Sequence, residues 1–264
     1  MLVHSPMARR LVHAVFALIV LPVFALPFAV ILIASFATNW SGALPSGPTL
    51  EQYRTVTSGD ALHALVTSLL TATAASLIAL VLGTWAAIVV HGMARLRRLA
   101  DSLFMLPVAV PSVVVGLALL VAFSRPPFLL NGTPGIVVMA HAVLITGFAY
   151  QSVAAALQRL DPVFEQSAAS LGATPGYVLL RVKLPLLLPS LSAATALCFA
   201  LSMGELSATM MLHPPDWLPL PVAIYAATNR GLVFIGSAQA ALLMTTTLLV
   251  LLLLNRVRTR ASYR

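Results

Sequence analysis

Charged residues are what this chain lacks most. Only 8% of its 264 residues are Asp, Glu, Lys or Arg, and just seven of them are acidic, whereas 60% are hydrophobic. Soluble domains devote about a quarter of their residues to charge. A chain this poor in charge cannot cover the surface of a soluble globular domain, so the composition predicts an integral membrane protein.

Cysteine and catalytic groupings are scarce too. Cys198 is the single cysteine and excludes an internal disulfide; it is predicted to be a small core residue. No Cys, His or Asp spacing fits a metal site, so no metal is expected, and His63 and His141 are predicted to be hydrogen-bonding core residues. The chain has no GxxxxGK[ST] phosphate loop and no paired acids or activated nucleophile, so no catalytic residue is predicted.

Long apolar runs dominate what is present. Each of six segments exceeds the roughly 20 residues that a helix needs to cross a bilayer. They are Leu11–Ala37, Leu62–Val90, Ser102–Ser124, Gly135–Leu157, Leu186–Leu212 and Leu232–Leu254. The expected fold class is therefore an all-α membrane protein with six transmembrane helices.

The basic residues indicate how these helices are oriented. If the N-terminus is cytoplasmic, twelve of the 15 Lys and Arg residues fall on the inner side, and only Arg54, Arg125 and Arg230 fall outside. This is a strong positive-inside bias. Both termini and the segment between the fourth and fifth spans are thus predicted to be cytoplasmic. The net charge of +8 is then an orientation signal, and no nucleic-acid binding is expected.

Prolines recur within the predicted spans, notably Pro107 and Pro111 in the third and Pro189 in the fifth. A proline frees a backbone carbonyl and kinks a helix. Two interpretations stay open. The kinks serve packing alone, or they expose unwound backbone along a transport path.

Between the fourth and fifth spans lies the only long stretch of mixed polarity, Asp161–Pro189. It is predicted to form two short helices with a corner. Asp161 caps the first helix and Gly172 ends it in a left-handed conformation. Thr174 caps the second helix, and Pro185 is predicted to end it.

The same stretch carries a specific motif. The residues Gln166-Ser167-Ala168, followed by Leu171-Gly172-Ala173 and Leu184-Pro185, resemble the EAA loop of type I ABC importer permeases. Gln166 and Ser167 stand where that family has Glu and Ala, although Glu165 is adjacent. The resemblance covers about the whole chain.

That resemblance implies a six-helix type I permease fold in a bacterial inner membrane, with a coupling helix at Pro162–Leu171. It implies a first span and its loop at 1–61, a permease domain at 62–254 with a coupling loop at 158–189, and a basic tail at 255–264. The residues implied to couple to an ATPase are Glu165, Gln166, Ser167, Ala168, Leu171, Gly172 and Pro185.

The implied partners are an ABC ATPase dimer, a second permease copy or paralogue, a periplasmic solute-binding protein and the lipid bilayer. ATP and Mg are used by the ATPase, and no cofactor is bound by this chain. The stretch Asp161–Pro189 is called the elbow below. The alternative for this elbow is an amphipathic loop on the lipid surface. The alternative for the whole chain is a secondary transporter or a membrane scaffold without an ATPase.

Stretches around the fifth span resemble permeases for 2-aminoethylphosphonate, a group close to permeases for polyamines, ferric iron and sulfate-type oxyanions. The resembling stretches include Leu201–Thr209, His213–Trp217 and Leu220–Tyr225. The resemblance implies 2-aminoethylphosphonate as the substrate.

Glu205 is the one carboxylate within a predicted span, and intramembrane acids are costly unless they face a polar interior or a partner. One interpretation is that it lines a translocation path with Ser202, Gly204 and Thr209 and meets a substrate ammonium group. The other is that it pairs with Arg230, with backbone or with neighbouring serines.

Overall fold

A computed structural model describes residues 6–261, and every regular element within them is helical. The all-α expectation is confirmed. The elements are α1 (Pro6–Ser35), α2 (Glu51–Val56), α3 (Gly59–Val90), α4 (Ala94–Ala109), α5 (Ser112–Ala122), α6 (Pro134–Arg159), α7 (Val163–Ser170), α8 (Pro175–Val178), the π-helical turn η1 (Leu179–Lys183), α9 (Leu184–Met203), α10 (Ser207–Leu212), α11 (Leu220–Asn229) and α12 (Val233–Ala261). The outermost residues of both predicted tails, 1–5 and 262–264, lie outside the described part.

Five described helices are long and apolar enough to cross a membrane, and a bent pair raises the number to six if it forms one span. Four of the six predicted segments correspond to single long helices in α1, α3, α6 and α12. The third and fifth segments do not. Both were predicted as continuous spans, and both are broken.

The third segment is split into α4 and α5, which meet at an angle of 99°. Val110 between them is extended, with φ −99° and ψ 137°. The cause is Pro111, because a proline ring clashes with a helical conformation of the preceding residue. The prediction of one continuous helix over Ser102–Ser124 was therefore wrong.

The fifth segment is split at Gly204–Leu206, between α9 and α10. The predicted run Leu186–Leu212 hides this break because it is largely apolar on both sides of Glu205. The break is stabilised by the only acid of the segment. A carboxylate oxygen of Glu205 accepts a 2.8 Å hydrogen bond from the backbone N–H of Ala208, in the first turn of α10.

The described chain divides into two compact units. The first comprises residues 1–62 and 223–242. In it, the Ser35 hydroxyl lies 2.7 Å from the Tyr53 hydroxyl, and the Phe36 and Tyr53 rings are 4.7 Å apart. Val56, Ala61 and Ala238 form its small core. These contacts fix the loop after α1 against α2.

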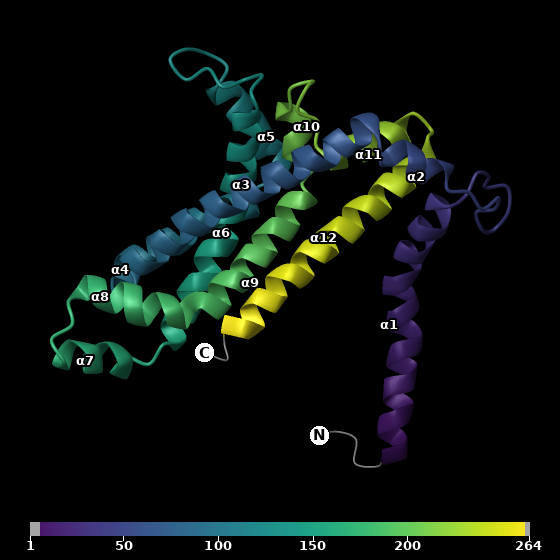
Figure 1. Ribbon diagram of the computed structural model, residues 1–264. Helices are drawn as coiled ribbons and strands as arrows, with labels where there is room; N and C mark the ends of the chain where they lie inside the picture. The colour runs from purple at the N-terminus through teal and green to yellow at the C-terminus, as the bar shows by residue number, and fades with distance from the viewer. Residues whose placement is uncertain (1–5, 262–264) are drawn as a thin grey trace. The chain divides into compact units, whose positions relative to one another are not determined.

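The second unit comprises residues 63–222 and 243–264, and α6 is its centre. The helix packs against α4, α5, α9 and α10, and thirteen of its residues are buried. Within this unit, α7 and α8 lie at one end and α5 and α10 at the opposite end (Figure 1). The second unit therefore contains both the predicted coupling loop and the predicted path residues.

Small residues allow close helix contacts in the second unit. A Cβ added to Gly116 of α5 would come within 2.9 Å of the Ala208 Cα in α10, so the two helix backbones touch. The segment between α10 and α11 is hydrogen-bonded to α3. The Trp217 indole N–H donates to the Thr71 hydroxyl at 3.0 Å, and the Leu220 N–H donates to the Ser68 hydroxyl at 2.8 Å.

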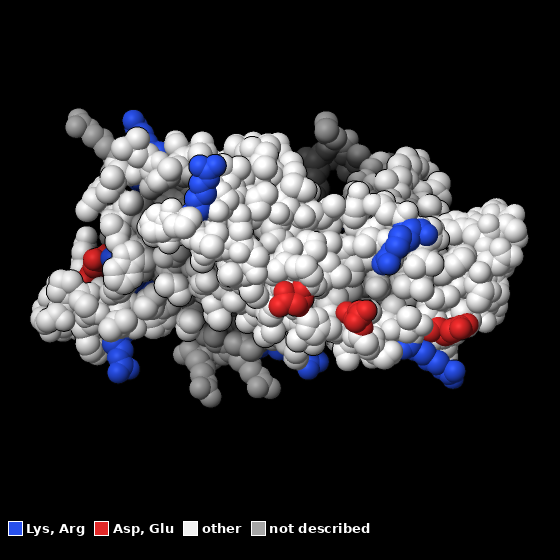
Figure 2. Space-filling model, turned by 90° about the horizontal axis from the view of Figure 1, so that it is seen from above, with Lys and Arg blue, Asp and Glu red and all other residues white. Residues whose placement is uncertain are grey.

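The surface agrees with the composition. Charged side chains are few in the view of Figure 2, and other residues make up most of the visible face. Many large apolar side chains are exposed, including Phe24 in α1 and Trp85 in α3. Exposed apolar residues on long helices are what contact with lipid requires.

His63 corrects one expectation. It was predicted to be a core residue, yet its side chain is exposed near the start of α3. The residues that α3 buries there are its neighbours Ala64 and Leu65, so His63 lies on the other face of the helix.

Candidate functional site

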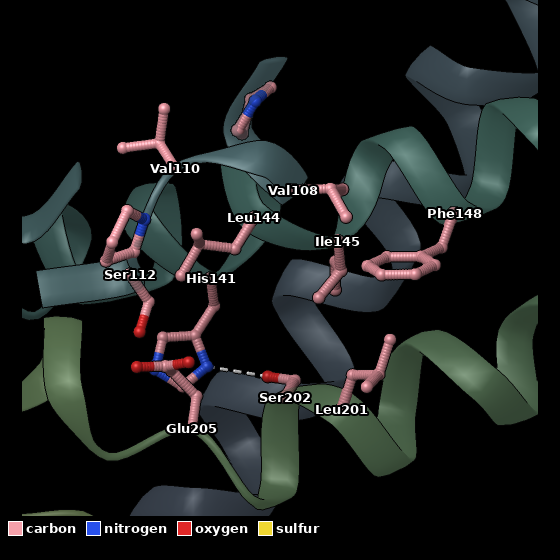
Figure 3. Close-up of a pocket in the computed structure, with 12 residues that line it drawn as sticks. Val108, Val110, Ser112, His141, Leu144, Ile145, Phe148, Leu201, Ser202 and Glu205 are labelled. Carbon is pink, nitrogen blue, oxygen red and sulfur yellow. Dashed lines mark hydrogen bonds between the residues drawn. The ribbon is translucent and has the colours of Figure 1, made fainter. Parts of the chain in front are cut away.

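The two broken segments border one pocket of about 330 Å³ in the second unit. From the α4–α5 break it receives Pro107, Val108, Val110, Pro111 and Ser112. Helix α6 contributes His141, Leu144, Ile145 and Phe148. Helix α9 contributes Leu201 and Ser202, and the break after it contributes Glu205. Ser112, His141 and Glu205 are directed into this pocket from three different elements (Figure 3).

His141 lies at the centre of a hydrogen-bond network beside the pocket. Its Nδ1 is 2.7 Å from the Ser202 hydroxyl in α9, and its Nε2 is 2.8 Å from the Thr209 hydroxyl in α10. The imidazole is buried and bridges the two halves of the fifth segment across the break. The prediction of a hydrogen-bonding core residue is confirmed.

The network also defines the proton positions. The Thr209 hydroxyl donates to the Glu205 carbonyl at 3.2 Å, so it must accept from the His141 Nε2–H. A neutral imidazole with its proton on Nε2 then accepts at Nδ1 from the Ser202 hydroxyl and satisfies all three bonds.

Two of the four predicted path residues line the pocket and two do not. Ser202 and Glu205 line the pocket. Thr209 is fully buried and bonded to His141, and Gly204 is exposed, and neither is among the residues that line this pocket. For Glu205, the bond to the Ala208 N–H matches the interpretation in which it pairs with backbone, while its second oxygen remains for the pocket.

Sequence reasoning did not find the contribution of the third segment to this site. The prolines at 107 and 111 were the available signal, but they are compatible with packing kinks as well as with exposed backbone. The break places Pro111 and Ser112 on the pocket wall, which favours the interpretation of exposed backbone over packing alone.

The predicted elbow forms as a corner at the opposite end of the unit. The N–H of Val163 donates to the Asp161 carboxylate at 2.9 Å, and the N–H of Tyr177 donates to the Thr174 hydroxyl at 3.4 Å. Gly172 has φ +82°, in the left-handed region. The caps and the corner are confirmed.

Pro185 does not end the second helix of the elbow, so that prediction was wrong. Helical structure is continuous from Pro175 to Met203 and passes through the π-helical turn η1. In that turn the Leu184 N–H donates to the Leu179 carbonyl, five residues back. Pro185 follows directly after this turn, at the second residue of α9.

The elbow presents apolar side chains that nothing in the described chain covers. Phe164 is 53% exposed and Leu171 is 89% exposed. Ala168 between them is half-buried. The Lys183 ammonium and the Glu165 carboxylate, 2.8 Å apart, join the first helix of the elbow to η1.

The described residues contain no cluster of three or more His, Cys, Asp and Glu side chains that could hold a metal ion. Cys198 is buried, with its thiol 3.6 Å from the Ile145 carbonyl, and so occupies the core position predicted for it.

Comparison with known proteins identifies the family. Residues 79–261 match the family described as "Binding-protein-dependent transport system inner membrane component". Among curated relatives, "Putative 2-aminoethylphosphonate transport system permease protein PhnV" of Salmonella typhimurium is 44% identical over 262 residues, which cover 98% of each chain. The "Putrescine transport system permease protein PotI" of Escherichia coli (strain K12) is 28% identical and covers 83% of this chain and 80% of the relative.

The fold has solved counterparts. A chain of the bacterial alginate ABC transporter, in complex with its alginate pentasaccharide-bound periplasmic protein, superposes with a TM-score of 0.70 at 18% identity. The match covers 96% of this chain and 93% of the other. A chain of an amino acid ABC transporter, solved with histidines, superposes with a TM-score of 0.58 at 18% identity over 80% of this chain and 96% of the other.

A family match over most of the chain, nearly full-length identity to a transport permease and the fold of ABC transporter chains agree with the apolar helices described above. The chain therefore belongs to the binding-protein-dependent transport system inner membrane components and is a multi-pass ABC importer permease, not an enzyme.

Proposed function

We propose that this permease carries 2-aminoethylphosphonate from a periplasmic solute-binding protein across the inner membrane. The observation that carries the assignment is the 44% identity, over 98% of both chains, to the Salmonella typhimurium permease named for that substrate. The putrescine permease is less similar, at 28%. The presence of an acid in the pocket is compatible with both amine-bearing solutes.

The exposed elbow supports a docking role on the cytoplasmic side. Its apolar residues Phe164 and Leu171 project from a corner that two caps and one left-handed glycine hold rigid. A helix lying on lipid would carry basic residues on its polar face, whereas Glu165 is the only charged residue between Asp161 and Arg181. The elbow is therefore assigned to an ATPase subunit, which binds and hydrolyses ATP with Mg.

The remaining partners follow from the same assignment. The alginate transporter was solved with its periplasmic protein, which supports a binding protein for this permease as well. Few membrane-spanning helices are available to enclose a path, so a second permease copy or paralogue completes it. Both termini and the elbow face the cytoplasm in this arrangement.

Uptake of radiolabelled 2-aminoethylphosphonate tests the substrate. The permease is expressed with its ATPase and binding protein in a strain unable to import phosphonates, and putrescine, molybdate and ferric iron are measured in parallel. Uptake of 2-aminoethylphosphonate alone is expected. Preference for another solute would overturn the substrate while leaving the importer assignment intact.

The need for an ATPase is tested in the same strain. Disabling the phosphate-binding lysine of the ATPase is expected to abolish uptake, because the permease has no phosphate loop of its own. Full uptake without nucleotide hydrolysis would show a secondary transporter instead.

A further inference from the structure

We propose that the pocket between the two broken segments is a binding site for the ammonium group of the transported solute, with Glu205 as its counter-charge. The inference rests on the proposed function and deepens it, since it identifies where the permease itself recognises the solute. The site would be formed by Ser112 of α5, His141 of α6, Ser202 of α9 and Glu205 in the break after α9.

The charge of the pocket favours a cation. Among the described residues that line it, Glu205 is the only one with a formal charge at neutral pH, and none is Lys or Arg. A neutral His141 satisfies every bond of the network that bridges the fifth segment, so the network itself requires no positive charge at the pocket. An oxyanion entering here would meet a carboxylate without a compensating cation, which is unfavourable at low dielectric.

The polar atoms match the donors of an ammonium group. A primary ammonium has three N–H donors and no acceptor. One oxygen of Glu205 is used by the Ala208 N–H, which leaves the other for a ligand. When Ser202 donates its proton to a neutral His141, its oxygen keeps a lone pair as an acceptor, and Ser112 adds a second hydroxyl to the lining.

The size and construction of the pocket agree with a small solute. Its volume of about 330 Å³ is at the lower end of the roughly 300–1,000 Å³ typical of small-molecule sites. Apolar residues, among them Leu144, Ile145 and Phe148, make up much of its wall. An apolar wall strengthens the ion pair between Glu205 and an ammonium group, and the small volume favours small solutes.

Thiol protection measures binding in the permease without relying on the binding protein. The single native cysteine is removed as Cys198→Ala, and Ser112→Cys places a thiol on the pocket wall. Purified importer is treated with N-ethylmaleimide in the presence of 2-aminoethylphosphonate, ethylamine or ethylphosphonate. The control thiol, Ser41→Cys, is exposed in the loop after α1 and is not among the residues that line the pocket.

Both amines are expected to slow modification of Ser112→Cys on the order of fivefold at saturation, by mass action. Ethylphosphonate, which lacks the amine, is expected to have no effect, and Ser41→Cys should react equally under all conditions. Equal protection by ethylphosphonate, or no protection by either amine, overturns the proposal.

The Glu205→Gln substitution tests the charge alone. The amide oxygen can still accept from the Ala208 N–H, so the cap of α10 is kept while the counter-charge is lost. Protection by the amines is expected to disappear, and Glu205→Asp should restore part of it. Unchanged protection in Glu205→Gln overturns the proposal.

A second readout tests the charge of the pocket without the Gln variant, so its result does not depend on the folding of that variant. In the parent, a trimethylammonium-bearing methanethiosulfonate should modify Ser112→Cys on the order of tenfold faster than a sulfonate-bearing one, because Glu205 attracts the cation. A ratio equal to that at Ser41→Cys would contradict a negatively charged site. Because neither assay measures uptake, failure of the ammonium site and failure of the assigned substrate are distinguishable.

Discussion

His141 illustrates how one buried side chain can hold a discontinuous helix together. Its two ring nitrogens bond to Ser202 before the break and Thr209 after it, and Thr209 in turn bonds to the Glu205 carbonyl within the break. All of these side chains except that of Glu205 are buried. The imidazole thus does for the broken segment what continuous backbone bonds do elsewhere in a helix.

Removing this bridge has a predictable cost. His141→Ala removes the partner of the buried Ser202 hydroxyl and one of the two partners of the buried Thr209 hydroxyl, and we expect the free energy of unfolding to fall by about 2 kcal/mol. Thermal unfolding of the purified importer in detergent measures the change. The matched control is His63→Ala, whose parent side chain is exposed on α3, and it should unfold like the parent. Equal stability of both variants would contradict the bridging role.

Glu165 and Lys183 form a second residue-scale test. Their ion pair is partly exposed, so its direct effect on stability is expected to be small. We expect Glu165→Lys to lower binding-protein-stimulated ATPase activity, and the exchange Glu165→Lys with Lys183→Glu to restore it to within about twofold. Restoration would mean that the pair positions the elbow. Failure of the exchange to restore activity would mean that Glu165 contacts the ATPase directly.

At the scale of elements, the corner of the elbow depends on one backbone conformation. Gly172 has φ +82° and no atom near the position of a Cβ, so space does not limit substitution there, but conformation does. A left-handed conformation costs a residue other than glycine about 1–2 kcal/mol, and more with a β-branched side chain.

Gly172→Val is therefore expected to loosen the corner and to reduce the amount of ATPase that co-purifies with the permease several-fold. Gly176→Ala is the matched control, because Gly176 is equally uncrowded and lies in the first turn of α8 without a positive φ. Retention of ATPase by both variants would contradict a rigid docking corner.

The sequence predicted elements better than their interruptions. Apolar length is enough to identify α1, α3, α6 and α12, because crossing a bilayer requires it. The break at Glu205 could not be read in the same way, because apolar residues lie on both sides of it and part of its stabilisation comes from His141, 61 residues away from Ser202. Capping residues, whose partners are local, correctly indicated the corner of the elbow.

Pro185 shows the opposite error. A proline normally marks a helix boundary, but the π-helical turn that precedes it shifts the bonding pattern, so the helix continues. No residue in the sequence distinguishes this case from a true helix end.

At the scale of the whole molecule, cysteine labelling measures which side of the membrane the elbow and the loop after α1 face. In a Cys198→Ala background, a cysteine at Ser170 in the elbow should react with a membrane-impermeant maleimide only from the cytoplasmic side. A cysteine at Ser41 should react only from the periplasmic side. Both parent side chains are exposed, so accessibility within the chain does not limit either reaction. The reverse pattern in intact cells would invert the proposed topology.

The helical continuity from Pro175 to Met203 carries a mechanical consequence. Its 29 residues correspond to a rod about 43 Å long, with one end at the elbow and the other next to the break that bears Glu205. A tilt imposed at Tyr177 is transmitted to Met203 without crossing a loop, and its only irregular stretch is η1. A displacement applied at the elbow end of this helix is therefore expected to move Glu205, which lies two residues beyond its other end.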